Sequence, residues 1–243
     1  KSIAVLNFEN LLSEKTGEYL CSAITEGIRT ALARLGKLDV KSRLISIKMK
    51  NDSPEFDKSM EVDYFVEGSL SSISKNRQIN VSLVNAKTGN NVWSNQYIFS
   101  DSQIIQFQDS ILRNITANLG VGFSSDQTNF QKTSYTNASA FQFLGKGIYH
   151  YDNNDYLSAL SAFDTAIVLN PDYLQAHFHR ANTYYKLGDY NNALNIYQNI
   201  LGQSKDINHI NWEWVLPEMK NVNQTYFAGS RRSSRLERNN ENI

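Results

Sequence analysis

The hexapeptide Asp155-Tyr156-Leu157-Ser158-Ala159-Leu160 recurs 34 residues further along the chain as Asp189-Tyr190-Asn191-Asn192-Ala193-Leu194. Self-similarity at such a period is typical of helical repeat proteins, in which each helix pair buries its apolar face against the next pair. At the same offset, Phe163 corresponds to Tyr197. The repeat therefore predicts two antiparallel helix pairs over residues 138–203.

The ends of the repeated region are marked by residues that do not continue a helix. Asn170-Pro171 is expected to end the first pair, because proline disfavours the helical conformation of the residue before it. Beyond the second pair, residues 204–228 are interpreted as a capping helix or a partial third repeat. The polar, aperiodic residues 229–243 have the composition of a basic disordered tail.

The residues before the repeats show a different pattern, in which short apolar runs alternate with amphipathic stretches. In chain order these are a strand at 3–6, a helix at 17–35, three strands between 64 and 99, and a helix at 103–119. This order predicts an α/β or α+β domain over residues 1–122, with a mixed sheet packed by helices. Residues 123–137 are rich in Ser, Thr, Asn and Gln, which is typical of a linker between separately folded units.

The composition excludes several classes of protein. The chain has 24 basic and 24 acidic residues, and neither half carries the basic surface expected of a nucleic-acid-binding protein. The single cysteine, Cys21, excludes an internal disulfide and a multi-cysteine metal site. No apolar run reaches about 18 residues, so membrane contact is expected only through an upstream segment. The start at Lys1, directly before a strand, is interpreted as the beginning of an excised piece.

The sequence also lacks the motifs that mark common active sites, including a phosphate-binding loop and a His-Glu-x-x-His metal motif. His177 and His179 would point in different directions from one helix, which favours surface or groove roles. Glu9 and Glu67 leave open a hydrolytic hypothesis, because paired carboxylates can serve as general acid and base. Our principal expectation is a protein that is not an enzyme, without catalytic residues, cofactor or metal.

The first 120 residues resemble the TolB amino-terminal-like domain family. The family's opening has proline at the position of Asn7 and otherwise agrees with Ile3-Ala4-Val5-Leu6-Asn7-Phe8-Glu9-Asn10. Further agreement is found at Thr25-Glu26, at Glu67-Gly68-Ser69 and at Val92-Trp93. The resemblance implies the mixed sheet and helices that the residue pattern also predicts.

The second half resembles tetratricopeptide repeats. The matching residues are Gly147, Tyr156, Ala159, Phe163, Ala166 and Pro171 in the first repeat, and Tyr184, Gly188, Tyr190, Ala193 and Tyr197 in the second. The second repeat departs from the pattern at Lys205, where the family has proline. The resemblance implies a partner-binding groove formed by Tyr151, Asp152, Phe178, Asn182, Tyr185 and Lys186. For the three aromatic residues, the alternative is that they fill the core between helices.

Together the two resemblances imply a sensory or adaptor region, as found attached to adenylate cyclases or winged-helix regulators, that binds a protein or peptide. The alternative is a structural envelope-assembly factor of the periplasm, which would hold a peptide or strand through its α/β domain. A bacterial, extracytoplasmic location is implied, with a cytoplasmic location as the alternative. Homodimer formation is left open.

Overall fold

The computed structural model describes residues 1–43, 46, 62–74, 76–100, 103–104, 106–122 and 137–203. The predicted capping segment at 204–228 and the predicted tail at 229–243 lie outside these residues, as does all of the predicted linker except Asn137. Asn137 caps the helix that follows, because its side chain accepts hydrogen bonds from the backbone N–H groups of Ser139 and Ala140.

The first part of the chain forms one mixed sheet. Its strands are β1 (Ser2–Val5), β2 (Glu9–Asn10), β3 (Asp39–Val40), β4 (Tyr64–Ile73), β5 (Asn76–Asn85) and β6 (Asn91–Phe99). The order across the sheet is β3-β1-β4-β5-β6, and β2 pairs with β4 further along. The pairs that include β1 or β2 are parallel, whereas β4, β5 and β6 form an antiparallel meander. The predicted mixed sheet is confirmed.

The opening motif of the sequence forms β1 and β2 with residues 6–8 between them, and the last of these is Phe8. Its backbone N–H donates to Thr25 Oγ1 of the first helix at 3.1 Å, and its ring lies in the space above Gly68 of β4. A Cβ at Gly68 would lie 2.7 Å from this ring and 2.4 Å from the carbonyl oxygen of Asn80. The family motif at 67–69 therefore needs glycine in its middle to admit the aromatic ring.

Helices α1 (Lys15–Arg34) and α3 (Gln106–Asn118) pack against the sheet. Their apolar faces meet those of β4 and β5 in a buried core that includes Ile24, Ile28, Leu70, Val81, Ile111 and Ile115. The amphipathic spacing in the sequence predicts both helices, and the structure confirms them.

The second part of the chain consists of two helix pairs, α5 (Ala138–Asp152) with α6 (Tyr156–Leu169), and α7 (Leu174–Lys186) with α8 (Tyr190–Gln203). The recurring aspartates have the same task in each repeat: Asp155 accepts a hydrogen bond from the N–H of Ser158, and Asp189 accepts one from that of Asn192. Ala159 is fully buried. The predicted helical hairpins are confirmed.

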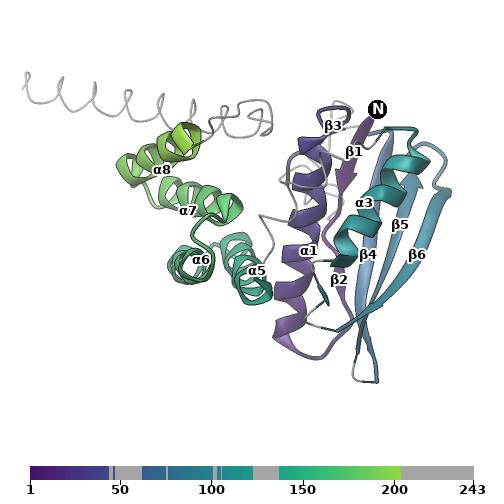
Figure 1. Cartoon of the computed structure of the whole chain (residues 1–243), viewed down its shortest axis with the longest axis horizontal. Helices are drawn as coiled ribbons and strands as arrows, with labels where there is room; N and C mark the ends of the chain where they lie inside the picture. The colour runs from purple at the N-terminus through teal and green to yellow at the C-terminus, as the bar shows by residue number, and fades with distance from the viewer. Residues whose placement is uncertain are drawn as a thin grey trace, which may run out of the picture.

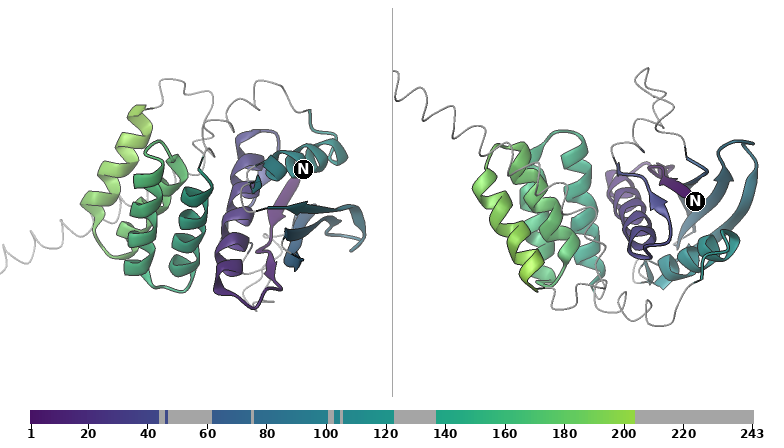
Figure 2. Two further views of the ribbon diagram at one scale, coloured as in Figure 1. Left: turned by 60° about the horizontal axis from the view of Figure 1, so that its bottom comes forward. Right: turned by 90° about the horizontal axis from the view of Figure 1, so that it is seen from above.

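The two parts of the chain share one core. Helix α1 lies between the sheet and α5, as the views in Figures 1 and 2 agree. The same cluster of buried residues contains Ile24 of α1, Phe141 and Leu144 of α5, and Phe163 of α6. The linker-like composition suggested separately folded units, but the structure packs the repeats directly on the α/β domain.

Candidate functional site

The six residues predicted to form a groove lie on α5 and α7, and their aromatic members pack within the repeats. Phe178 is buried, with its ring centroid 6.0 Å from that of Tyr197. Tyr151 lies 5.6 Å from Tyr156 between ring centroids. Tyr185 has a similar contact with Tyr190, at 5.7 Å. These rings contribute to the packing of each helix pair.

The three polar members of the set have different surroundings. Asn182 accepts a hydrogen bond from the hydroxyl of Tyr197. Asp152 forms an ion pair with Arg43 of the α/β domain. Lys186 is exposed in the last turn of α7. The surface around Asn182 and Lys186 is therefore the part of the predicted groove that lies away from α1.

The contact between α1 and α5 is close because both helices have small residues where they cross. A Cβ on Gly145 would lie 2.0 Å from the carbonyl oxygen of Tyr19 and 2.8 Å from the Cβ of Ala23. The spacing of residues along the repeats does not predict this contact with the α/β domain. Gly147, two residues on, faces Phe163 of α6 instead, as expected of a glycine within a repeat.

A buried carboxylate lies at the same junction. Glu26 of α1 is only 2% exposed, and its oxygens lie 2.5 Å from Arg29 Nη2, 3.1 Å from His179 Nε2 and 3.6 Å from Arg43 Nη1. Thr30 donates a hydrogen bond to the same carboxylate at 3.1 Å. The carboxylate of Glu26 therefore has partners in its own helix, in the segment after β3 and in α7.

Arg43 joins this carboxylate to the first repeat, since its guanidinium also binds Asp152 of α5. Burial by itself would lower the pKa of Arg43, but Asp152 and Glu26 outweigh burial and raise it. We call Glu26, Arg29, Arg43, Asp152 and His179 the junction cluster. It connects α1, the segment after β3, α5 and α7.

The placement of His179 corrects a prediction from the sequence. Surface or groove roles were expected, but the residue is buried, and its ring lies 5.7 Å from that of Phe163 in a stacked arrangement. The contact between His179 and Glu26 joins segments that are far apart in the sequence, so the spacing of residues along one helix cannot predict it. The only local signal is Glu26, an acidic residue within a largely buried helix.

Acid should weaken the junction through Glu26. Burial by itself would raise the pKa of this carboxyl, but Arg29, His179 and Arg43 hold it well below the ordinary value of 4.5. Its contribution to stability is complete above the pKa of the unfolded chain and is lost as the pH falls through the folded-state pKa. We therefore expect the free energy of unfolding to decline below pH 4.5.

Urea denaturation across this pH range measures the effect, and comparison with Glu26→Gln isolates it from other carboxyl groups of lowered pKa, such as Asp63 and Asp155. The variant should be less stable at neutral pH and should lose less stability on acidification. Parallel curves for the two proteins would show that Glu26 is not the responsible group.

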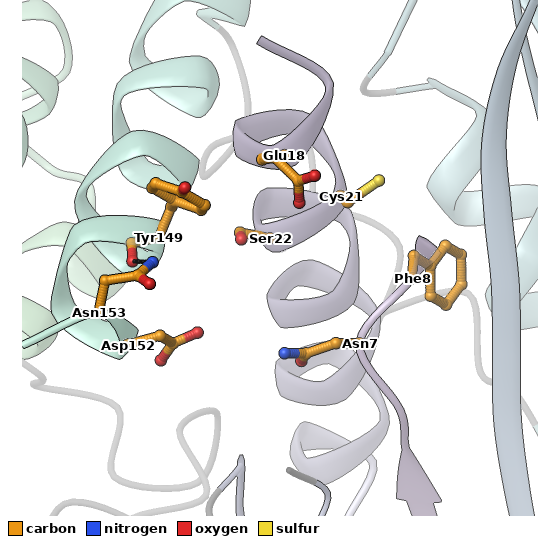
Figure 3. A pocket seen from close by; sticks show the side chains of 8 residues that line it. All are labelled: Asn7, Phe8, Glu18, Cys21, Ser22, Tyr149, Asp152 and Asn153. Carbon is orange, nitrogen blue, oxygen red and sulfur yellow. Dashed lines mark hydrogen bonds between the residues drawn. The ribbon is translucent and has the colours of Figure 1, made fainter. Parts of the chain in front are cut away.

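Beside the junction cluster, α1 and α5 border a small, partly open cavity of about 180 Å³. Figure 3 shows side chains of both helices facing each other across it, and its lining residues are Asn7, Phe8, Glu18, Cys21, Ser22, Tyr149, Asp152 and Asn153. Small-molecule sites usually have volumes of about 300–1,000 Å³. The cavity is thus a feature of the helix contact, smaller than a typical cofactor site.

The residues considered for chemistry do not meet in one enclosed site. Glu9 of β2 is paired with Ser69 of β4, two residues from Glu67, but both glutamates are exposed and neither lines the cavity. Cys21 is buried. Within the described ranges, no three His, Cys, Asp or Glu side chains form a group that could hold a metal ion. In the same ranges, no helix is long and apolar enough to cross a bilayer.

Fold and junction define a two-part scaffold, in which an α/β domain is joined through a buried interface to helical hairpins. Residues 144–206 match the tetratricopeptide repeat family, so the prediction of these repeats is confirmed. Repeats of this kind provide surfaces for protein interaction.

Among curated proteins, the chain is similar to "Putative adenylate cyclase 3" of Rhizobium meliloti (strain 1021). The two are 30% identical over 129 residues, which cover 52% of this chain and 22% of the relative. The chain thus spans less than a quarter of that protein's length.

Similar solved structures include TolB from Acinetobacter baumannii, with a TM-score of 0.36, 15% identity, and coverage of 49% of this chain and 28% of TolB. Lipoprotein GNA1162 from Neisseria meningitidis has a TM-score of 0.35 and 13% identity, covering 48% of this chain and 96% of its own.

Proposed function

We propose that this chain is a non-catalytic interaction and sensory region of a larger signalling protein. The tetratricopeptide surface around Asn182, Tyr185 and Lys186 binds a peptide segment of a partner protein. When the peptide binds, the α/β domain changes the activity of an effector domain elsewhere in the parent protein. The similarity to a protein named as an adenylate cyclase supports a nucleotide cyclase as that effector.

The junction between the two parts carries this proposal. A flexible tether would let the repeats bind a partner without affecting the α/β domain. Here Glu26 and Arg43 on one side meet His179 and Asp152 on the other in a buried contact. Binding energy that favours one arrangement of α5 and α7 therefore also acts on α1.

The second candidate is a structural envelope-assembly factor that holds a peptide or strand through its α/β domain. It is supported by the resemblance of the first 120 residues to the TolB amino-terminal-like family. The two proposals place the bound peptide on different halves of the chain, and variants on each half distinguish them.

Selection of peptides from a displayed library on the immobilised chain tests both proposals. Lys186→Glu is expected to weaken the selected peptides about tenfold, because it reverses a charge at the edge of the binding surface. Lys15→Glu, at an exposed position of α1, is the matched control and should leave affinity unchanged. Peptides that instead respond to Glu67→Lys, at an exposed position of β4, would favour the envelope role.

A further inference from the structure

The two edges of the sheet are very different. At one edge, β3 pairs over only two residues, and its Asp39 forms an ion pair with Lys41 at 2.6 Å. At the other, β6 runs for nine residues from Asn91 to Phe99, and in the described part of the chain it pairs with β5 alone (Figure 1). Short, charged edges resist pairing with another chain, whereas long edges invite it.

Strand β6 lacks the features that normally protect such an edge. Its sequence, Asn-Val-Trp-Ser-Asn-Gln-Tyr-Ile-Phe, contains no charged residue and no proline. Val92 and Ile98 are 41% and 57% exposed. The backbone N–H of Gln96 donates to the side chain of its own neighbour, Asn95, at 2.8 Å. Among the described residues β6 has a hydrogen-bond ladder on one side only, and here a side chain of the strand itself accepts from the backbone N–H.

We propose that β6 pairs antiparallel with β6 of a second copy of this chain, about a two-fold axis at Asn95. In this register Trp93 lies opposite Tyr97 of the second copy, and Ser94 lies opposite Gln96 of the second copy. Aromatic residues therefore oppose aromatic ones, and uncharged polar residues oppose polar ones. A two-fold dimer requires a surface that complements itself in this way.

The side chains of β6 are placed suitably for this arrangement. Tyr97 faces the helices, since its hydroxyl accepts a hydrogen bond from Asn114 of α3 at 3.1 Å. Ser94 lies on the other face, with its Oγ 3.1 Å from that of Ser82 at an exposed position. Because strand residues alternate between faces, Gln96 lies on the same open face as Ser94. Both positions can carry charge without entering the core.

Sedimentation of the chain over a range of concentrations should show a species of about twofold the monomer mass. Ser94→Lys combined with Gln96→Lys should give a monomer, because like charges would then oppose each other across the axis. The same two positions changed to Glu should also give a monomer. Mixing the Lys and Glu proteins should restore the dimer, a result that misfolding of either variant cannot produce.

The matched control adds the same charge elsewhere, as Asn195→Lys with Asn199→Lys on the exposed side of α8, and should leave the dimer intact. In a separate measurement, Asn95→Cys should cross-link two copies on oxidation, because opposed residues of antiparallel strands lie within disulfide range. A wild-type chain that stays monomeric overturns the proposal. A dimer that survives the Lys pair, or a mixture that stays monomeric, overturns it as well.

Discussion

Replacing Glu26 with alanine should lower the free energy of unfolding by about 3–5 kcal/mol, because Arg29 would then lack its counter-charge and Arg43 would keep only Asp152. Arg29 and Arg43 are 15% and 13% exposed, so water cannot replace the lost carboxylate. The ion pairs that are lost lie at the contact between α1 and the repeats. We therefore also expect the two halves of the variant to unfold in separate transitions, where the wild-type chain unfolds in one.

Urea denaturation followed by circular dichroism measures both effects. The matched control is Glu14→Ala, which removes an exposed carboxylate just before α1 and should change stability by less than about 0.5 kcal/mol. If Glu26→Ala behaves like this control, the junction cluster does not hold the two halves together.

Gly145→Ala should lower the free energy of unfolding by about 2 kcal/mol, although alanine is the better helix former. The added Cβ would lie 2.0 Å from the backbone carbonyl oxygen of Tyr19, which cannot move aside as a flexible side chain can. Helices α1 and α5 must therefore separate, and overpacking of this kind usually costs about 1–3 kcal/mol. Ala23 lies at the same crossing, so separation of the two helices also removes its contact with α5.

The same substitution at Gly202 in α8 provides a control of opposite sign. No atom of the described residues lies within 4 Å of a Cβ placed there. Gly202→Ala should therefore show only the helix preference of alanine and stabilise the chain by up to about 1 kcal/mol. Equal effects at the two positions, measured by thermal and urea denaturation, would contradict the close contact of α1 with α5.

The sequence predicts the separate helices and strands well because their signals are local. Asp155 and its counterpart Asp189 both cap helices. Ala159 and Phe163 correspond to Ala193 and Tyr197, and these residues are buried where the hairpins pack. These features depend on spacing within a few turns of one helix. The predicted groove follows from the repeats in the same way, but family positions do not show which groups are already bound within the chain, as Asp152 is by Arg43.

The sequence by itself determined the two kinds of folded unit, their order, and the approximate positions of the helices and strands that it predicts. Only the tertiary structure decided that α1 is buried on two sides, that His179 lies beside Glu26, and that β6 is the last strand at one edge of the sheet in the described residues. The physical reason is distance along the chain. Hydrophobic period and capping depend on near neighbours, whereas a helix crossing or a buried ion pair depends on residues more than a hundred positions apart, which no local pattern records.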